Sequence, residues 1–342
     1  MFGTLKHPAI ATLTVLTLTG LALPAQAQSD LPQPGELALR TARAYREQAR
    51  YPESSRVLRA GEADPVRTQR TPTKQSRRGP EGAGPELSVW ASQVSVEVGK
   101  PIDLYAELLS LGEPSLPLEV NGEIAGPAGE IVAQVAYRDD GRTPDRRAGD
   151  GIWSARLTLP AGLEPDGAAP YMVRTTARLL DGDLRQAAGG FLYSNPSARL
   201  TGRYRDTVKD GNLILSAEVD VREAGRFHLS GTLYSLQGEP IGTAQAAAQL
   251  EPGRRWIRLS FYGLMFHDRK VAGPYRLGSL ALATAGRMPM ALNDLVENAY
   301  VTKGYKLGAM TAAPFADPKL LEAAARLDLD GLRAQADPTA RE

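Results

Sequence analysis

Apolar and polar residues alternate along many short segments between residues 86 and 300, and this pattern restricts the fold more than any other feature. Val94, Val96 and Val98 alternate with Ser95 and Glu97, and the pattern returns later in the chain. A period of two residues places successive side chains on opposite faces of a half-buried strand. Glycine, proline and aspartate separate the segments as they do at turns. The sequence therefore predicts an all-β fold of short antiparallel strands.

The predicted strands fall into two groups, residues 86–195 and residues 196–310, with Asn195-Pro196-Ser197 as the hinge between them. About seven or eight short strands in the first group are typical of an immunoglobulin-type sandwich. Pro170-Tyr171 and Pro274-Tyr275 open similar segments, which lie about one such domain, or roughly 100 residues, apart. The sequence thus predicts two tandem immunoglobulin-like antiparallel β-sandwiches.

The segment before these groups has a different composition. Glu36 to Arg50 is rich in good helix formers. Proline, glycine and arginine then dominate as far as Pro85, without an apolar period. We therefore predict that residues 28–85 form a basic arm, which begins with a helix and continues as extended chain. The arm either stays solvated or lies on an acidic domain or an anionic envelope polymer.

A second helix is expected near the C-terminus, within residues 311–342. Asp317-Pro318 is a typical helix start, because proline at the first helical position needs no amide hydrogen. One face of this helix carries Leu320, Leu321, Ala324 and Leu327. We expect it to pack across the second sandwich, to end near Gly331, and to be followed by a disordered tail.

Residues 1–27 have the pattern of a secretory signal peptide. Lys6 and His7 precede an apolar run, and Ala25-Gln26-Ala27 supplies the small residues of a cleavage site. The alternative is a membrane anchor, but the run is shorter than the roughly 20 residues that span a bilayer. The chain has no cysteine, which excludes disulfides and a lipid-modified cysteine. We predict a periplasmic or secreted protein that is not a lipoprotein and has no transmembrane segment after cleavage.

Four carboxylates are concentrated between residues 139 and 150. Asp139, Asp140, Asp145 and Asp150 could bring several oxygens to one point, as calcium requires. Neighbouring arginines balance their charge, and the aspartate spacing of an EF-hand is missing. The alternative is a long turn whose aspartates accept hydrogen bonds from backbone amides. Two predictions therefore stay open, one structural calcium or no cofactor.

The chain has few residues suited to catalysis. It contains no Gly-x-Ser-x-Gly, no His-Glu-x-x-His and no phosphate-binding glycine loop. His228 falls on the outward face of a predicted strand, and His267-Asp268 lies in a predicted turn. Paired carboxylates of the glycosidase type could occur among the 39 acids. We therefore predict no enzyme, with no catalytic residue to name, and keep a hydrolase that uses dispersed carboxylates as the alternative.

The tryptophans differ in their predicted positions. Trp153 shares a face with Ala155 and Leu157, which predicts a place in the core. Trp256 alternates out of phase with its apolar neighbours and lies beside Arg254 and Arg258. These three residues are the candidate contact for a ligand or partner. The net charge of +1 argues against a nucleic-acid partner.

Several motifs resemble those of exported bacterial immunoglobulin-like proteins of the choice-of-anchor X type. They include Asp139-Asp140-Gly141, Ala148-Gly149-Asp150-Gly151-Ile152-Trp153, Gly273-Pro274-Tyr275 and Ala299-Tyr300-Val301-Thr302. The resemblance implies the tandem fold and export, and leaves activity open because most such proteins have unknown functions. Pro144, Arg146 and Arg147 depart from the pattern around the third aspartate, which weakens the inherited case for a cation.

Together these features predict a non-enzymatic binding, adhesion or accessory protein of the bacterial cell envelope. The expected partner is an envelope protein or polysaccharide.

Overall fold

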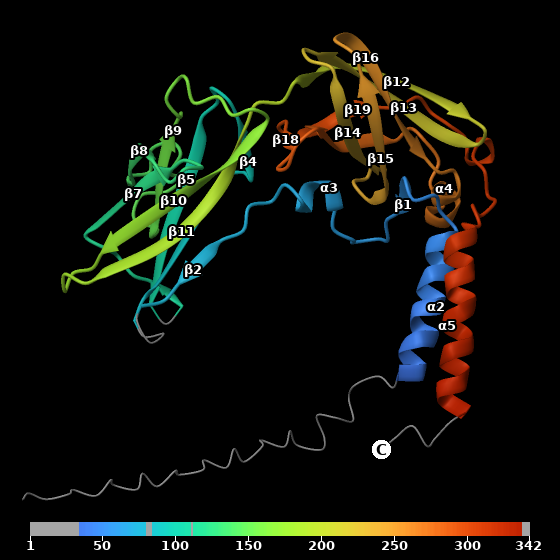
Figure 1. Ribbon diagram of the computed structural model, residues 1–342, viewed down its shortest axis with the longest axis horizontal. Helices are drawn as coiled ribbons and strands as arrows, with labels where there is room; N and C mark the ends of the chain where they lie inside the picture. Colours follow the sequence, from blue (N-terminus) through green and yellow to red (C-terminus); the bar gives the residue numbers. More distant parts are fainter. Residues whose placement is uncertain (1–33, 80–83, 111, 337–342) are drawn as a thin grey trace, which may run out of the picture. The chain divides into compact units, whose positions relative to one another are not determined.

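The structure is a computed structural model that describes residues 34–79, 84–110 and 112–336. The predicted signal peptide lies outside these residues. Strands dominate and helices are few, as the all-β prediction requires (Figure 1). Arg50–Asp317 forms one compact unit, and the chain on either side of it forms another.

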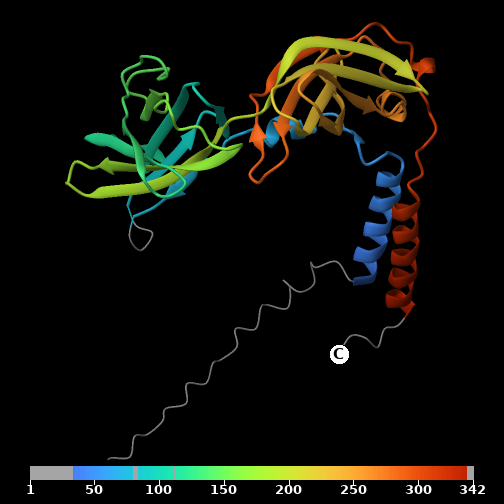
Figure 2. The same ribbon diagram turned by 45° about the horizontal axis from the view of Figure 1, so that its top comes forward.

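The smaller unit is a pair of helices, α2 (Pro34–Ala49) and α5 (Pro318–Ala336). They lie side by side and run in opposite directions (Figure 1, Figure 2). Small residues form the contact. A Cβ atom on Gly331 would lie 2.7 Å from Leu39 Cγ and 2.9 Å from the carbonyl oxygen of Gly35. Arg46 forms an ion pair with Asp328 across the helices.

One detail of the predicted C-terminal helix is wrong. The helix starts at Pro318 as expected, but it continues through Gly331 to Ala336, because Gly331 allows close approach to α2 rather than ending the helix. Within its own unit the helix packs along α2, and the expected contact with the second sandwich stays a prediction. The end of the predicted disordered tail, residues 337–342, lies outside the described part.

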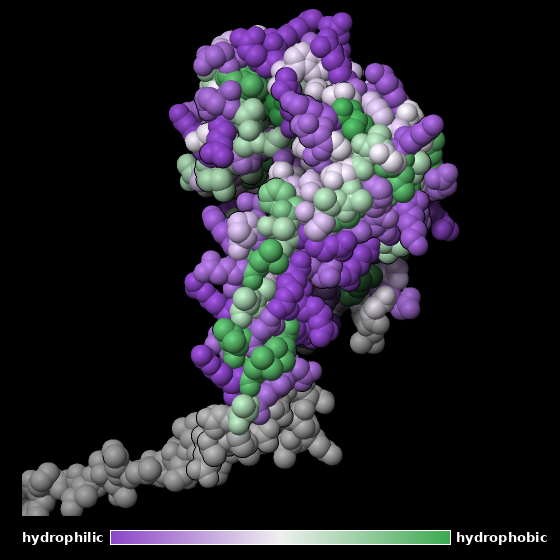
Figure 3. Space-filling model, turned by 90° about the vertical axis from the view of Figure 1, so that its right-hand side faces the viewer, coloured by the Kyte–Doolittle hydropathy of each residue, from purple (hydrophilic) through white to green (hydrophobic). Residues whose placement is uncertain are grey.

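Apolar side chains remain exposed on this helical unit, among them Leu37, Leu321, Leu329 and Leu332. Figure 3 shows apolar surface running along it. In the described part of the chain, no helix is long and apolar enough to cross a membrane.

The first β domain, residues 84–195 with β2, consists of two sheets around one core. One sheet has the order β2-β3-β5-β6 with β9 beside β5, and the other has the order β4-β11-β10-β7-β8. Both sheets contribute buried side chains to one cluster, including Leu104, Ile124 and Phe191. The strands are β2 (Gln75–Arg77), β3 (Glu86–Ala91), β4 (Ser95–Glu97), β5 (Ile102–Ser110), β6 (Glu113–Pro114), β7 (Glu119–Ala125), β8 (Ile131–Ala136), β9 (Ile152–Leu157), β10 (Ala168–Arg178) and β11 (Leu184–Ser194).

The second β domain, residues 196–310 with β1, is also sandwich-like. One sheet has the order β1-β15-β14-β17-β18 with β19 beside β17, and the other is β12-β13-β16. Its own cluster of buried side chains includes Phe227, Phe261 and Tyr275. The elements are β1 (Ser55–Val57), β12 (Ala198–Lys209), β13 (Asn212–Val221), β14 (Gly225–Tyr234), β15 (Pro240–Leu250), β16 (Gly253–Phe261), α4 (Leu264–Arg269), β17 (Arg276–Thr284), β18 (Ala291–Leu292), β19 (Val296–Val301) and η2 (Leu307–Ala309).

The two β domains share one topology. In the first, β3, β5 and β9 form one sheet opposite β11-β10-β7-β8; in the second, β12, β13 and β16 form one sheet opposite β19-β17-β14-β15. Each strand of one set has a counterpart of the same rank in the other. The similar segments that start at Pro170 and Pro274 belong to counterpart strands, with Pro170 inside β10 and Pro274 just before β17.

The segment between Arg50 and Gly79, predicted as an extended arm, is largely extended and pairs with both β domains. β1 extends the second domain's sheet by pairing with β15, and β2 pairs with β3 of the first domain. Between them lies a short helix, α3 (Pro65–Thr68). Tyr51, Leu58 and Val66 are buried, so apolar contacts hold this segment on the β domains, whereas composition had left a solvated arm and a docked arm both open.

Candidate functional site

The acidic loop connects β8 to β9, and its carboxylates accept hydrogen bonds from the loop's own backbone. Asp139 accepts from the amides of Gly149 at 2.6 Å and Gly151 at 3.0 Å. Asp145 accepts from the amides of Gly141 at 2.5 Å and Arg147 at 3.0 Å. These bonds join the two ends of the loop, so the aspartates fix the path of its backbone.

Three of the four predicted metal ligands converge. Asp139, Asp145 and Asp150 each offer a carboxylate oxygen within 4.8 Å of the others. Asp140 is not part of this group and accepts from the amide of Arg142. Calcium binds six to eight oxygens, so three carboxylates would supply only part of its shell.

The arginines of the loop do not pair with these carboxylates. Across the described residues, no ion pair joins Arg138, Arg142, Arg146 or Arg147 to the aspartates. The expected charge balance is therefore not made through direct contacts; the backbone amides are the direct partners. Calcium at this loop stays a prediction.

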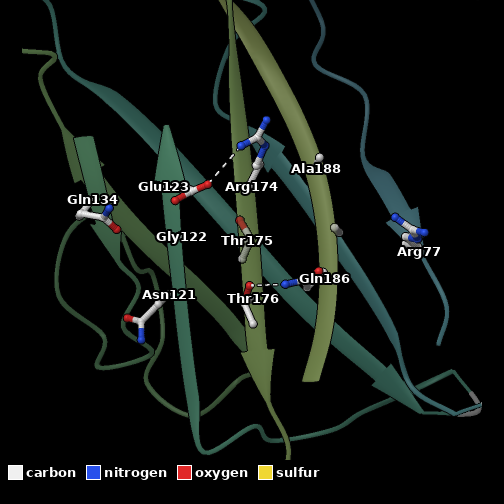
Figure 4. A pocket seen from close by; sticks show the side chains of 11 residues that line it. Arg77, Asn121, Gly122, Glu123, Gln134, Arg174, Thr175, Thr176, Gln186 and Ala188 are labelled. Atoms are coloured by element: carbon white, nitrogen blue, oxygen red, sulfur yellow. Dashed lines mark hydrogen bonds and ion pairs between the residues drawn. The ribbon is translucent and has the colours of Figure 1, made fainter. Parts of the chain in front are cut away.

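A hollow of about 480 Å³ lies in the first β domain, on the outer face of the sheet β4-β11-β10-β7-β8. Register explains its lining: Arg174 on β10 lies between Glu123 on β7 and Ala188 on β11, and Thr176 lies between Asn121 and Gln186. Long polar side chains thus surround residues with small side chains, such as Ala188, and the difference in length leaves the hollow. The lining consists of Arg77, Asn121, Gly122, Glu123, Gln134, Arg174, Thr175, Thr176, Gln186, Ala187 and Ala188 (Figure 4).

The hollow offers both donors and acceptors of hydrogen bonds. Arg174 forms an ion pair with Glu123 at 3.3 Å, and Gln186 donates to Thr176 at 3.4 Å (Figure 4). Gln134, on β8, lies directly opposite Glu123 and extends the row. Guanidinium, carboxylate, amide and hydroxyl groups in adjacent rows suit a ligand with many hydroxyl or carbonyl groups.

Sequence analysis did not single out this hollow. The alternation from Tyr171 to Leu179 predicts Arg174 and Thr176 on the outward face of a strand, and the structure confirms that placement. The order β11-β10-β7-β8 that brings their neighbours beside them could not be derived from one strand's pattern.

The two tryptophans that sequence analysis singled out, Trp153 and Trp256, are both partly buried in the structure. Trp153 is partly buried and packs against the first domain's core, so it lies at the margin of the core rather than within it. Trp256 is partly buried on β16, beside the exposed Arg254 and Arg258. The guanidinium carbon of Arg205 lies 4.3 Å from the centroid of the Trp256 ring.

A buried carboxylate that sequence analysis missed lies in the segment before the β domains. Asp64 caps α3 and accepts from three hydroxyls of the second domain, Thr232 and Tyr234 at 2.6 Å and Ser279 at 2.5 Å. Only Asp64-Pro65 marked the position in sequence, as a helix start of the same kind as Asp317-Pro318. This carboxylate anchors the segment and has no room for a substrate.

The histidines do not form a catalytic group in the described residues. His267 Nε2 lies 3.0 Å from the carbonyl oxygen of Met310, and no hydrogen bond or ion pair in the described part joins His228 or His267 to a carboxylate or serine. Acyl transfer usually requires a nucleophile beside a base, and the two described histidines do not form such a pair.

Residues 197–297, most of the second β domain, match the C-terminal domain of a family described as a domain of unknown function, DUF4785. Comparison with curated proteins finds no match. The likeness to choice-of-anchor X proteins stays a prediction.

Among solved structures, a DUF4785 family protein from Legionella pneumophila is 19% identical, with a TM-score of 0.46, and the similarity covers 67% of this chain and 59% of that one. Latent PorU from Porphyromonas gingivalis is 9% identical, with a TM-score of 0.20, over 68% of this chain and 20% of that one. A tetra-tandem repeat from the extending region of a large adhesion protein is 13% identical, with a TM-score of 0.19, over 64% of this chain and 57% of that one.

Proposed function

We propose that this chain is a non-enzymatic, exported binding or accessory protein of the bacterial cell envelope, and that it binds a saccharide in the hollow of the first β domain. The hollow carries the proposal. Its rows of amide, hydroxyl, guanidinium and carboxylate groups provide donors and acceptors at the spacing of neighbouring strands. A ligand with hydroxyl groups on a rigid ring can satisfy several of them at once.

We also propose that both β domains are immunoglobulin-like. The shared topology supports this, since each domain pairs a sheet of its first, second and fifth main strands with a sheet of the other four. Such a split between two antiparallel sheets is typical of immunoglobulin and fibronectin type III architectures. Loops and sheet faces of these folds carry binding sites on a rigid scaffold.

The charge content of the hollow favours binding over hydrolysis. A glycosidase needs two carboxyl groups on opposite sides of the scissile bond. Among the described residues that line the hollow, Glu123 is the only acid, and it is already paired with Arg174. The competing proposal, a hydrolase using dispersed carboxylates, finds no paired arrangement here.

A binding experiment with matched variants tests the proposal. The chain from Gln28 onwards is screened against neutral and acidic envelope saccharides, and the best ligand is measured by calorimetry. We expect Arg174→Ala and Gln186→Ala each to weaken binding at least tenfold. Gln249→Ala, which removes an exposed strand glutamine of the second domain, serves as the control and should bind as the unmodified chain does.

Two results would contradict the proposal. Binding that the Arg174 and Gln186 variants leave unchanged would place the site elsewhere. Release of reducing ends that stops in Glu123→Gln would support the hydrolase instead. Export is tested separately, by cell fractionation and N-terminal sequencing, with Gln28 expected as the first residue of the exported chain.

A further inference from the structure

The outer face of the sheet β12-β13-β16 is rich in arginine. On β16, Ile257 and Leu259 point into the core, so Arg254, Trp256 and Arg258 share the outer face. Ser216 on β13 lies between Arg205 and Arg258 in register. Two rows further along the same face, Asp220 lies between Arg199 and Arg254, and in the row between them Glu218 lies opposite Trp256. The two outer strands, β12 and β16, therefore contribute guanidinium groups to one surface across β13. We call this surface the arginine face; it consists of Arg199, Arg203, Arg205, Arg254 and Arg258.

Trp256 lies at the centre of the arginine face. It is flanked on β16 by Arg254 and Arg258, and Arg205 reaches it from β12, on the far side of β13. The short side chain of Ser216 leaves the path across β13 open. A guanidinium over an indole ring is held by cation–π attraction, and this attraction leaves its N–H edge free to bind an anion.

The positive charge of the arginine face is only partly neutralised. Arg199 pairs with Glu97 at 3.3 Å and Arg203 with the buried Glu218 at 3.9 Å. Among the described residues, Arg205, Arg254 and Arg258 have no carboxylate within ion-pair distance, and all three are exposed. Asp220 lies opposite Arg254 in register without forming an ion pair. Three guanidinium groups thus remain available beside one tryptophan.

We propose that the arginine face binds an acidic glycan, a polymer of sugars that carry carboxylate or phosphate groups. Guanidinium binds both anions through two parallel hydrogen bonds. The indole, over which Arg205 lies, holds that guanidinium at the centre of the arginine face. Arg254 and Arg258 lie four residues apart on one strand, about 13 Å between Cα atoms, so contact with both requires an extended ligand.

A glycan fits the arginine face better than a nucleic acid does. Proteins that bind single strands without sequence preference stack successive bases on several aromatic side chains. The arginine face has one tryptophan, and the other outward side chains of the described strands β12, β13 and β16 are not aromatic. This site lies in the second β domain and does not depend on the proposed function of the hollow.

The test uses the chain from Gln28 onwards and four probes: polygalacturonate, phosphate-bearing lipopolysaccharide, neutral dextran and single-stranded DNA. We expect at least tenfold tighter binding to an acidic glycan than to dextran, and weaker binding as salt rises. The two acidic probes show whether carboxylate or phosphate is preferred. Arg254→Glu with Arg258→Glu should weaken the acidic-glycan binding at least tenfold, and Trp256→Phe should weaken it less.

Two controls separate this site from the rest of the molecule. Arg226→Ala removes an exposed arginine from the other sheet of the same domain and should not change binding. Arg178→Ala removes an exposed arginine of the first β domain that does not line the hollow, and it should also leave acidic-glycan binding unchanged. Circular dichroism confirms that each variant is folded. The proposal is overturned if the double glutamate variant binds like the unmodified chain, if no acidic glycan binds, or if DNA binds more tightly than both acidic glycans.

Discussion

At the scale of single residues, Asp64 shows how a buried carboxylate can be stable in a cysteine-free domain. Burial alone would raise its pKa, but hydrogen bonds from Ser279, Thr232 and Tyr234 and from the Arg67 amide lower the pKa below its ordinary value. Burial, together with the hydrogen bond to Asp64 and the charge of that carboxylate, raises the pKa of Tyr234 to about 12. The folded state therefore favours the ionised form of the Asp64 carboxylate.

Replacing Asp64 by asparagine should destabilise the second β domain. The amide side chain has one acceptor oxygen where the carboxylate has two, and its NH₂ group would face hydroxyl donors. We expect a loss of about 2 to 3 kcal/mol in the free energy of unfolding, as for a hydrogen-bonded buried charge. Urea denaturation measures it. Glu251→Gln, an exposed control on the same domain, should change stability by less than about 0.5 kcal/mol.

The loss in Asp64→Asn should depend on pH. A carboxyl whose pKa is lower in the folded state stabilises the fold above its unfolded pKa of about 3.9, and this stabilisation disappears as pH falls through the folded pKa. The stability difference between the two chains should therefore be constant from about pH 7 to 5 and shrink below about pH 4. A difference that stays the same at pH 3 would rule out titration of Asp64 as the cause.

Trp153→Ala should also be costly, although Trp153 is only partly buried. The indole packs against the first domain's core and lies opposite Ala106 on β5. Truncation to alanine removes most of that contact, at a cost of about 3 kcal/mol, the lower end for a large aromatic side chain. Trp153→Phe keeps much of the packing and should lose less. Equal stability of the alanine variant and the unmodified chain would show that the ring does not support the core.

At the scale of elements, the acidic loop is fixed by its own backbone hydrogen bonds. The oxygens of Asp139 and Asp145 accept from four loop amides before any cation is considered. Glycines at positive φ, including Gly141 and Gly151, provide backbone angles that other residues rarely adopt. Aspartate and glycine together thus account for the loop's shape.

We therefore expect calcium to have little effect on stability. Thermal melts in a chelator and in millimolar calcium should give the same Tm, because three carboxylates that already hold amides make an incomplete calcium shell. Asp150→Asn serves as a comparison, since it removes one of the three converging groups. A rise in Tm of several degrees with calcium, lost in this variant, would establish a structural cation.

The positions of the strands along the sequence were easier to predict than the partners with which the strands pair. Alternation from Leu213 to Val221 corresponds to β13, and alternation from Ile102 to Leu108 corresponds to β5. Composition could not show that Ser55–Val57 pairs with β15, because a strand at a sheet edge needs only three residues with the right backbone. Gly331 was misleading for a similar reason, since its role depends on a helix almost three hundred residues away in sequence.

At the scale of the whole chain, binding surfaces depend on strand order, which is the least local property of a sandwich. The outward position of Arg174 or Trp256 could be predicted from period alone. That Arg174 lies beside Glu123, and Arg205 beside Trp256, depends on which strands are neighbours. One sequence therefore predicted the all-β class and the outward residues, but not how these residues combine into sites; the compartment stays a prediction.

Removing the segment before Gly79 should destabilise the second β domain strongly. A chain that begins at Gly79 lacks β1, Asp64 and the buried Leu58 and Val66. Each buried aliphatic side chain contributes about 1.5 to 3 kcal/mol, so we expect the Tm to fall by at least about 10 °C. As a control, residues 50–317 lack only the helical unit and should melt like the full chain. Equal melting of both truncated chains would show that the segment adds no stability.

The position of Asp64 in the chain also affects the order in which the second β domain can form. Its hydroxyl partner Thr232 lies 168 residues further along, so during synthesis Asp64 exists long before the strands that enclose it. Contacts between such distant residues form slowly, because the intervening chain must lose conformational entropy before the contact stabilises the fold. Until β14 and β17 are in place, the segment around Asp64 has nowhere to dock. We expect its capture to be a late step of folding, completed only after the strands that supply its partners have formed.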